Sequence, residues 1–534
     1  MRLSFSFLHY LFVFLVFSSL GIELYSQMPI ECSIDYEPEG EITPVVNTEF
    51  CELINFEEED YRSLAEFTVY VNFHFIEDEL GNNFHCDPNG DPDLYAPAIV
   101  EEILKFSNNY FEDPQLNQLS TNPGKVYDAR IRFELYTNPS NSGDLCGGIF
   151  FHPRNANTTI IEPSEALYGN QVLNVTIRDD NGLYNSTDPS DATVGGSTGG
   201  VGSDYIRLRN LLWYHKNGFY HPWNYGRTLN HELGHILNLP HSFSCHNDCY
   251  DMDNTLACGG PDGCTVSNIT NTTCNPGPPP YCNESWGGAP DCCFCSWGNG
   301  NNFMGYNGDP RGMTPCQWET MFNYILSRED WTYASFCTKE EPILRITSGE
   351  QIQWDKLKLL NRDVVIESGA SLEITCEVRM GEDHRFVVHR GGKLIIDEGK
   401  ITNLCPDTRW AGIAVHGNAA KEQPDPFGTQ AADDAGILII QNGSIIEHAA
   451  DAILTTAPGW PWPDFEQYFG GVVYAESSEF IDNGRVAGFM RYDFENKSQF
   501  IDCLMKKTPE SFGNAIGVTI WECDGINFEQ NSFE

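Results

Sequence analysis

The segment HELGHILNLPH, residues 231–241, contains three histidines and a glutamate at spacings that suit a divalent metal ion. Positions i and i+4 lie on the same face of an α-helix, so His231 and His235 can bind one ion. Zinc accepts imidazole nitrogens at about 2.0–2.1 Å, and three protein ligands leave one position open for water. Glu232 follows the first histidine and can act as a general base towards that water. The pattern therefore predicts a hydrolytic zinc centre.

The third histidine requires a change of backbone direction. His241 lies six residues beyond His235, too far round for a straight helix to bring it to the same ion. The backbone must leave the helix near Asn238 in a turn with positive φ, which glycine adopts most readily and asparagine next. Pro240 then prevents the helix from resuming. With such a turn, His241 can reach the ion that the other two histidines bind.

These residues resemble the metzincin metallopeptidases, whose pattern is HExxHxxGxxH followed by a methionine turn. The methionine turn would be NNFMGY, residues 301–306. Within that group the chain is most similar to the pappalysin family (pregnancy-associated plasma protein-A). The similar segments are TLNHELGHILNLPHSF, the CHNDCYDMDNT that follows it, and the MTPCQWETM after the methionine turn. The similarity covers roughly residues 65–330.

The resemblance implies functional roles for particular residues. It makes His231, His235 and His241 the zinc ligands, with Glu232 as the general base. It also makes Met304 the hydrophobic floor beneath the metal.

Two further roles follow from the same resemblance. Tyr306 would bind the metal at rest or donate a hydrogen bond to the oxyanion. Structural calcium is implied near the active site, with Asp248, Asp251 and Asp253 as candidate ligands. The chain departs from the family pattern at Asn238, where glycine is usual, and in a long cysteine-rich insertion before the methionine turn. The insertion would shape the substrate cleft or restrict entry to it.

The elements that must position these residues follow a mixed α/β pattern from residue 67. Strand-like composition or alternation marks residues 67–76, 129–136 and 171–179. Residues 180–204 are rich in Gly, Ser and Asp and predict a loop region. We therefore expect an α+β metzincin-like catalytic domain with a mixed sheet, an active-site helix and a cysteine-rich lower part.

Two further helices are predicted in this domain. Residues 96–111 place Ile99, Ile103, Phe106 and Tyr110 at helical spacing. Residues 315–326 form a closing amphipathic helix that begins with proline.

After about residue 343 the sequence changes to short strand-like runs separated by Gly or Asn. Frequent strands without helices between them predict a solenoid. The segments SEFIDN, SQFIDC and INFEQN echo one another, so Phe480, Phe500 and Phe528 are expected on successive coils. This part resembles right-handed parallel β-helices of the pectin-lyase-like kind, and a β-sandwich is the alternative. The sequence stops at NSFE in mid-repeat, which favours a truncated chain.

Composition restricts the class of partner and the compartment. The net charge of −45 argues against nucleic acid or an anionic membrane as a partner. Of the 19 cysteines, ten lie between residues 245 and 316, which indicates a disulfide scaffold in an exported protein rather than a structural zinc cluster. The first 26 residues resemble a secretory signal peptide, with an uncleaved anchor as the alternative. No second apolar run of that length follows, so no membrane span is expected in the mature chain.

The predicted order of segments has four parts. A signal peptide occupies residues 1–26, and an N-terminal extension or short propeptide occupies residues 27–65. The zinc metallopeptidase domain spans residues 66–338, and the β-helix-like repeat region spans residues 343–534. In the extension, Cys32 or Cys51 can either cap the metal before activation or form an ordinary disulfide.

The leading interpretation is a secreted, extracellular zinc endopeptidase in which zinc-activated water attacks the peptide bond and Glu232 is the general base. Its partners would be protein or peptide substrates, with cell-surface or polysaccharide ligands for the β-helix. The alternative is a surface adhesin or carbohydrate-binding protein with an inactive peptidase domain. Retention of Glu232 together with all three histidines argues against that alternative. Polysaccharide-lyase chemistry on the solenoid is a third interpretation, but no spacing around Asp397, Lys400 and Arg409 marks a catalytic group.

Overall fold

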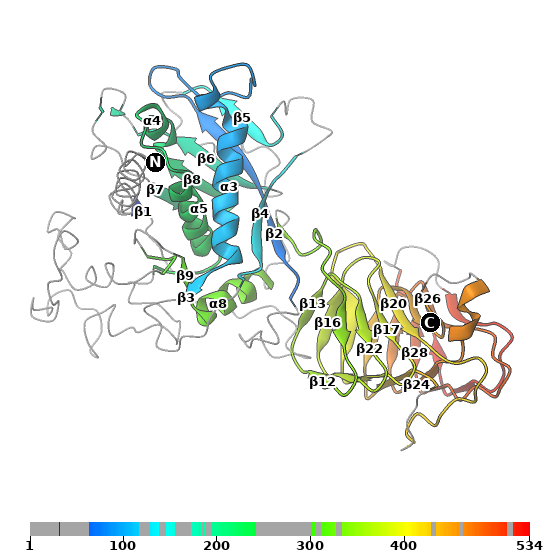
Figure 1. The fold of residues 1–534 in the computed structure, drawn as a ribbon. Coiled ribbons are helices and arrows are strands. Elements are labelled where there is room, and N and C mark those ends of the chain that lie inside the picture. Colours follow the sequence, from blue (N-terminus) through cyan, green and yellow to red (C-terminus); the bar gives the residue numbers. More distant parts are fainter. Residues whose placement is uncertain are drawn as a thin grey trace, which may run out of the picture. The chain divides into compact units, whose positions relative to one another are not determined.

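The chain divides into two compact units, each described here by itself. The computed structural model describes residues 31–32, 64–116, 126, 128–137, 146–154, 172–180, 182–183, 186–187, 195–241, 302–305, 311–326, 334–428, 434–458, 463–509 and 516–534. The first unit includes residues 68–334, and the second includes residues 335–534 together with the described residues 64–67 (Figure 1).

A mixed sheet forms the centre of the first unit, with the strand order β1-β7-β8-β6-β2-β10 and with β4 and β5 also pairing with β2. The strands are β1 (Glu31–Cys32), β2 (Phe67–Ile76), β4 (Ile131–Leu135), β5 (Ile149–His152), β6 (Leu173–Arg178), β7 (Gly195–Thr198), β8 (Tyr205–Arg209) and β10 (Ala334–Ser335). β2 runs parallel to β5 and β6, and β6 runs parallel to β8. β7 is antiparallel to β8, and β1 pairs with β7 in parallel. The predicted mixed sheet is confirmed.

The strands predicted from composition and alternation are present, but one predicted loop is not wholly a loop. Residues 67–76 form β2, and its residues on both faces, such as Phe73 and His74, are fully buried. A strand covered on both faces is typical of the interior of a parallel sheet. The loop predicted over residues 180–204 contains β7, so that prediction is wrong for residues 195–198. The sequence GGST shows no alternation, and its strand conformation depends on pairing with β8.

Four helices of the first unit lie among the described residues: α3 (Ala96–Glu112), α4 (Leu211–Lys216), α5 (Pro222–Ile236) and α8 (Pro315–Leu326). A 3-10 turn, η1 (Pro92–Leu94), precedes α3, and a small parallel pair joins β3 (Gln115–Leu116) to β9 (Gly312–Met313). α3 and α5 lie side by side (Figure 1). The helices predicted over residues 96–111 and 315–326 are confirmed.

The two long helices approach closely at a polar, small-residue contact. A Cβ at Gly226 of α5 would lie 2.8 Å from the backbone nitrogen of Ser107 in α3, so only glycine fits there. The Ser107 hydroxyl also donates to the Asn230 side chain, and Asn230 Nδ2 donates to Ser107 O at 3.0 Å. Ser107 at the contact is fully buried, whereas Phe106 and Tyr110, which the sequence places at helical spacing, are half-buried. This contact fixes the position of α5 at Asn230, the residue immediately before His231.

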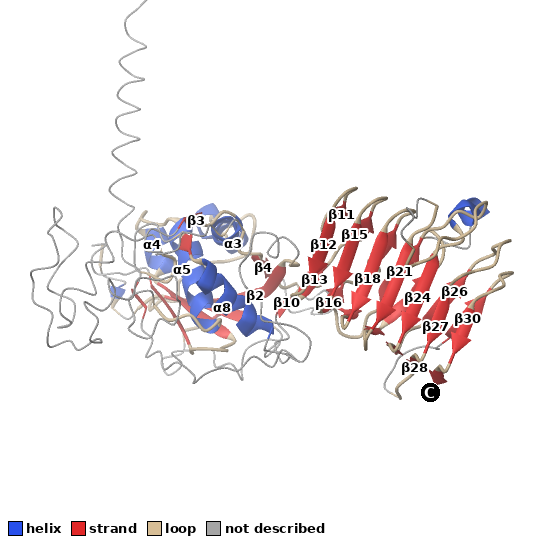
Figure 2. Cartoon of the chain, turned by 90° about the horizontal axis from the view of Figure 1, so that it is seen from below, coloured by secondary structure: helices blue, strands red, loops and turns tan. Residues whose placement is uncertain are grey.

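The second unit consists of three stacks of seven parallel strands each (Figure 2). The first contains β11 (Leu344–Ile346), β14 (Val364–Ile366), β17 (Arg385–Val388), β20 (Trp410–Val415), β23 (Ala449–Leu454), β26 (Arg485–Phe489) and β29 (Ile516–Ile520). The second contains β12 (Gln351–Trp354), β15 (Ser371–Ile374), β18 (Lys393–Asp397), β21 (Ile437–Gln441), β24 (Val472–Glu476), β27 (Gln499–Ile501) and β30 (Asn527–Glu529). The third contains β13 (Lys358–Leu360), β16 (Glu377–Met380), β19 (Lys400–Asn403), β22 (Ile445–Glu447), β25 (Glu479–Ile481), β28 (Leu504–Lys506) and β31 (Ser532–Phe533). A 3-10 segment, η6 (Pro463–Tyr468), precedes β24.

Because each coil contributes one strand to each sheet, the unit is a parallel β-solenoid. Its core is made of inward apolar residues that pair with their equivalents on the next coil, such as Leu372 with Leu394 and Leu394 with Leu438. The predicted solenoid is therefore confirmed, and the β-sandwich alternative is wrong.

The three phenylalanines lie on successive coils, as predicted, but only two of them are register partners. Phe500 and Phe528 are register partners in β27 and β30, and their rings stack at 5.1 Å. Phe480 instead lies in β25, where its partner on the next coil is Met505. The similar letters have a local cause, because FID in both places ends a strand at a corner residue with positive φ, Asp482 or Asp502. The motif therefore marks the same kind of corner on successive coils, once in the third sheet and once in the second.

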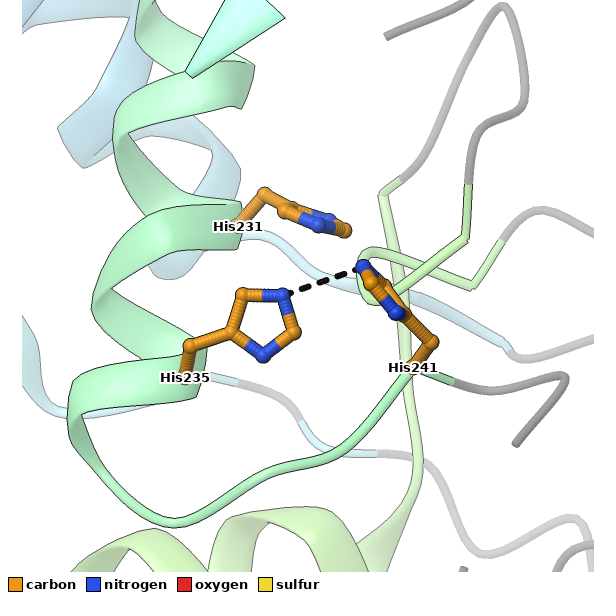
Figure 3. A group of neighbouring side chains, drawn as sticks. All are labelled: His231, His235 and His241. Carbon is orange, nitrogen blue, oxygen red and sulfur yellow. Dashed lines mark hydrogen bonds between the residues drawn. The ribbon is translucent and has the colours of Figure 1, made fainter. Parts of the chain in front are cut away.

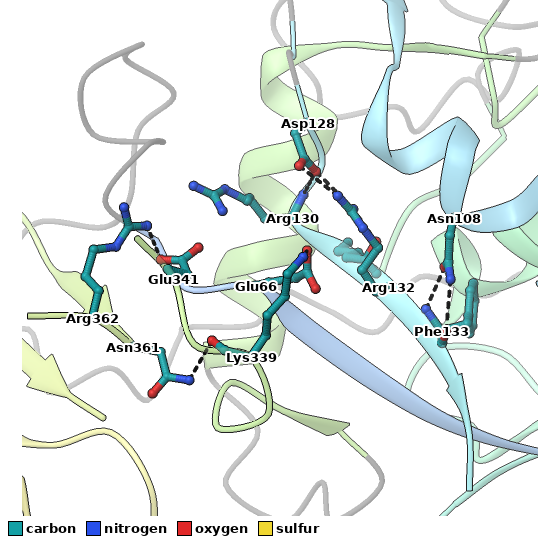
Figure 4. Close-up of polar contacts among 11 residues, drawn as sticks. Glu66, Asn108, Asp128, Arg130, Arg132, Phe133, Lys339, Glu341, Asn361 and Arg362 are labelled. Carbon is teal, nitrogen blue, oxygen red and sulfur yellow. Dashed lines mark hydrogen bonds and ion pairs between the residues drawn. The ribbon is translucent and has the colours of Figure 1, made fainter. Parts of the chain in front are cut away.

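The described residues that precede β2 belong to the second unit. Leu64 forms a parallel bridge to Leu359, and the amide of Ala65 donates to Leu359 O at 2.6 Å. The carboxylate of Glu66 forms an ion pair with Lys339 Nζ at 2.8 Å (Figure 4). Residues 64–66 therefore pack with the first part of the second unit before the chain enters β2.

Disulfides occur in both units. Cys86 bonds to Cys146 in the first unit, and Cys337 bonds to Cys405 in the second. These bonds agree with the exported, disulfide-containing class that the cysteine count predicts. Residues 242–301, which contain most of the predicted scaffold, lie outside the described residues. Among the helices of the described part of the chain, none is long and apolar enough to cross a membrane.

Candidate metal centre

The three histidines of HELGHILNLPH converge at the end of α5. His231 and His235 lie one turn apart on this helix and are fully buried, and His241 lies just beyond it with 9% of its surface exposed. One ring nitrogen from each histidine can be chosen so that all three atoms lie within 4.8 Å of one another (Figure 3). No other group of three or more His, Cys, Asp or Glu residues in the described ranges meets this criterion.

A left-handed turn brings His241 back towards the helix. Asn238 has φ of 69°, as the sequence predicts for the point where the chain leaves α5. The amide of Leu239 donates to Gly234 O at 2.9 Å, and the amide of Asn238 donates to His235 O at 3.1 Å. Together these bonds form a Schellman motif, the usual way for a helix to end at a residue with positive φ. Asn238 therefore replaces the usual glycine without loss of the turn.

Backbone carbonyls hold the two helical imidazoles in one tautomer. Nδ1 of His231 lies 2.9 Å from Phe303 O, and Nδ1 of His235 lies 2.8 Å from Leu239 O. Because a carbonyl can only accept, each Nδ1 must carry the proton, and each Nε2 then presents a lone pair. The Schellman turn thus has two effects. It places the carbonyl of Leu239 where it orients His235, and it directs the chain back so that His241 reaches the cluster.

The nitrogen geometry and chemistry fit a zinc ion. Nε2 of His235 and Nε2 of His241 are 3.2 Å apart (Figure 3). Two ligands at 2.0–2.1 Å in a tetrahedral zinc site are about 3.3 Å apart. Burial lowers the pKa of His231 to about 4 and that of His241 to about 3, and it lowers the pKa of His235 well below its usual value. All three imidazoles are therefore neutral at neutral pH, the form that binds metal.

A glycine of β7 fixes the position of Glu232. A Cβ at Gly196 would lie 2.5 Å from Glu232 Oε1 and 2.7 Å from Cγ2 of Thr228, so β7 passes directly over the carboxylate. Glu232 itself is fully buried. Sequence analysis missed Gly196 because a glycine-rich stretch was interpreted as a loop. The paired glycines next to Ser-Thr were the available signal, since a glycine in a strand often marks a close approach.

The turn that contains Met304 packs against the helix between the two helical histidines. Met304 is fully buried, and a Cβ at Gly234 would lie 2.3 Å from its sulfur. The amide of Gly305 donates to Asn302 O at 3.0 Å, which closes the turn. The structure thus places Met304 against Gly234, between His231 and His235 on α5, and its role as the floor beneath the metal stays a prediction. Tyr306 and the calcium candidates Asp248, Asp251 and Asp253 lie outside the described residues.

A mixed sheet with an active-site helix, a buried three-histidine cluster and an adjacent methionine turn define a metzincin-like metallopeptidase. The family model of pregnancy-associated plasma protein-A peptidases matches residues 172–326, a range that includes the histidine cluster, Glu232 and Met304. Residues 172–326 therefore match the metallopeptidase family of pregnancy-associated plasma protein-A, as the motif predicts.

The wider comparisons add little beyond the family. Among five matching chains of known structure is mature mirolysin of Tannerella forsythia in complex with a cleaved peptide, at 16% sequence identity. That match covers 48% of this chain and 89% of mirolysin, with a TM-score of 0.26. No curated protein matches this chain.

Proposed function

We propose that this protein is a secreted zinc-dependent endopeptidase. The observation that supports the proposal most directly is the convergence of three neutral, buried histidines beside a glutamate that is held against the backbone of β7. In this proposal His231, His235 and His241 bind the zinc ion. Protein or peptide chains are the substrates, as membership of a peptidase family implies. Secretion is supported by the disulfides and by the apolar N-terminal run.

The proposed chemistry assigns one proton-transfer residue. A bound zinc ion would supply Lewis-acid chemistry, which polarises the peptide carbonyl and makes water a nucleophile near neutral pH. Glu232 then accepts the proton of the attacking water on a carboxylate oxygen and returns it to the leaving amine. Gly196 keeps this carboxylate in place, because the strand leaves it no room to move towards β7.

Two finer parts of the proposal concern residues outside the described ranges. Tyr306, two residues after Met304, donates a hydrogen bond to the developing oxyanion of the substrate. Asp248, Asp251 and Asp253 bind structural calcium, for which alternate carboxylates are suitable ligands. The tests are a Tyr306→Phe variant, expected to lower kcat more than it raises KM, and a calcium titration of unfolding with the triple Asp→Asn variant as the control.

A different class of function, a surface adhesin or carbohydrate-binding protein, uses the solenoid alone. The specific observation in its favour is an aromatic pair, in which the exposed Phe427, between β20 and β21, packs edge-on at 4.7 Å against the half-buried Tyr474 of β24. Exposed aromatic faces suit sugar rings or apolar ligands. This binding role is compatible with peptidase activity, and it replaces that activity only if the histidine cluster is inert.

Digestion of casein and gelatin by the full chain tests the enzyme proposal. Wild type with zinc and calcium should produce fragments, and Glu232→Gln should abolish them while retaining zinc. Glu367→Gln, on the solenoid surface, is a matched control and should digest like wild type. Equal cleavage by wild type and Glu232→Gln, or no cleavage by wild type with its metals supplied, would overturn the proposal. Mass spectrometry of the products from a peptide library would then identify the preferred bond.

A further inference from the structure

A buried pair of amide side chains ties the methionine turn to the N-terminus of α8. Asn302 precedes the turn and Gln317 lies in the first turn of α8, and their exposed fractions are 0% and 1%. Nδ2 of Asn302 donates to Oε1 of Gln317 at 2.8 Å, and Nε2 of Gln317 donates back to Oδ1 of Asn302 at 3.1 Å. Reciprocal amide pairing of this kind fixes both the separation and the orientation of the two residues.

Each acceptor oxygen of the pair also holds a backbone amide. Oδ1 of Asn302 accepts from the amide of Met304 at 2.9 Å, and Oε1 of Gln317 accepts from the amide of Thr314 at 3.2 Å. The amide of Gln317 donates in turn to the Thr314 hydroxyl at 3.2 Å, which caps α8. The pair therefore joins the helix start to the backbone of the methionine turn through hydrogen bonds alone.

The methionine turn in turn holds a metal ligand. Phe303 O, between Asn302 and Met304, is the carbonyl that accepts from Nδ1 of His231 at 2.9 Å. A shift of this carbonyl would rotate the His231 ring or release its tautomer, since Nδ1 has that oxygen as its acceptor. Hydrogen bonds therefore connect Gln317 to Asn302, Asn302 to the turn, and the turn to His231.

We propose that Asn302 and Gln317 are positioning residues for the zinc site, which set its metal affinity by fixing the carbonyl that orients His231. This inference rests on the proposed zinc-binding function. Neither residue touches the metal or the substrate. Partners of metal ligands commonly change affinity by about 10- to 100-fold when they are removed.

The central experiment compares zinc affinity in the full-length wild type and in Gln317→Met, which keeps the volume but removes every side-chain hydrogen bond. Chelator competition at fixed pH should show zinc affinity lower by about 10- to 100-fold. With cobalt(II) in place of zinc, the visible absorption bands should shift, because the ring of His231 changes its orientation. Gln317→Glu, which keeps both acceptor bonds but loses the donor to Asn302, should show a smaller decrease.

Asn108 provides a control of the same chemistry elsewhere in the first unit. Its side-chain amide bridges α3 to β4 through two bonds to the backbone of Phe133, at 3.0 and 2.8 Å (Figure 4). Asn108→Leu should lower the thermal unfolding midpoint of the metal-free protein but leave zinc affinity and the cobalt spectrum unchanged. A purely structural role for Gln317 would give the same pattern as Asn108.

A swapped variant tests the reciprocal bond directly. The double variant exchanges the two residues, Asn302→Gln with Gln317→Asn, so that one short and one long amide still face each other. It should restore most of the zinc affinity that Gln317→Met loses. Unchanged zinc affinity in both Gln317→Met and Gln317→Glu would overturn the inference. If wild type binds no zinc at all, the proposed function fails instead, so the two failures are distinguishable.

Discussion

Residues with positive φ occur in both units of the molecule, but their neighbours differ. In the solenoid, a corner residue such as Asp502 donates its amide to Glu529 O on the following coil, and Ser477 donates in the same way to Ile501 O. In the peptidase unit, the amide of Asn238 donates to His235 O in its own helix end. The solenoid repeats each corner contact along a stack, whereas the metal centre depends on contacts that occur once. A single substitution should therefore mainly lower the stability of the solenoid. In the peptidase unit it should mainly lower zinc affinity or catalytic rate.

The largest expected effect is on solenoid stability. Phe500 is fully buried and packs against Phe528, Phe480 and Phe489, so Phe500→Ala leaves a cavity in the stack. We expect a loss of about 3–5 kcal/mol in the stability of this region. Hydrogen exchange of the peptides around β24 and β27 should measure it. Zinc affinity should stay at the wild-type value, and a parallel loss of zinc would contradict the contrast between the units.

The next largest effect is on catalysis, at Gly196. A Cβ there collides with Glu232, and a displacement of about 1 Å at a reacting group can cost about 100-fold in rate. Gly196→Ala should therefore lower kcat/KM by about 100-fold while the protein keeps its zinc.

The solenoid offers a matched glycine for that experiment. A Cβ at Gly471 would lie 2.3 Å from Val415 O, so Gly471→Ala is equally crowded. It should lower the unfolding midpoint and leave kcat/KM unchanged. Similar kinetic losses in both variants would show that crowding acts through general destabilisation.

Acid should weaken the peptidase unit through a histidine that is not a metal ligand. His74 is fully buried, and its ring forms hydrogen bonds to His152 at 3.0 Å and to Asn174 at 2.9 Å. Burial lowers the pKa of His74 to about 4. A histidine whose pKa is lowered on folding contributes stability above its unfolded pKa of about 6.5, and loses it as the pH falls towards the folded value. Between pH 6.5 and pH 4, the free energy of unfolding should fall by at most about 1.4 kcal/mol per pH unit through this group.

A variant separates this contribution from other titrating groups. His74→Gln should be less stable than wild type at pH 7, because His152 and Asn174 lose a partner. The difference in unfolding free energy should narrow between pH 6.5 and pH 4. Parallel pH profiles for the two proteins would rule out His74 as the acid-sensitive group.

The sequence allowed prediction of local features with strong physical requirements. Two histidines four residues apart, a turn with positive φ at Asn238 and the β-branched and aromatic composition of residues 67–76 each depend on near neighbours, and each was predicted correctly. The repeated FID correctly indicated successive coils but not the sheet, since Phe480 lies in the third sheet and Phe500 in the second. The local sequence identifies the corner but not the sheet in which the corner lies.

The features that could not be predicted depend on pairing across long sequence separations. Strand β7 is defined by β8 and by Glu232, which lies 36 residues away in the sequence from Gly196. The Asn302–Gln317 pair requires the folded methionine turn and α8 together. Ser107 of α3 is polar yet fully buried, and its burial depends on the contact with Gly226 of α5. In each case at least one of the two partners lies in a segment with no apolar or periodic pattern that would predict the contact.

The smallest expected effect, and the closest comparison of the two units, uses one substitution at two left-handed residues. Asn238→Ala and Asp502→Ala each place alanine at positive φ, which costs about 1–2 kcal/mol. In Asn238→Ala, the strain can relax only by moving Leu239 and the path to His241, so zinc affinity should fall as well. Asp502→Ala should lower the unfolding free energy by a similar amount, with unchanged zinc affinity, because the amide at that corner still donates to Glu529 O on the next coil. Asn238→Gly should keep wild-type zinc affinity, since glycine adopts the same turn without strain. Isothermal zinc titration and urea unfolding of all three variants give the comparison, and a loss of zinc affinity in Asp502→Ala would mean that the solenoid corners and the metal centre are not independent.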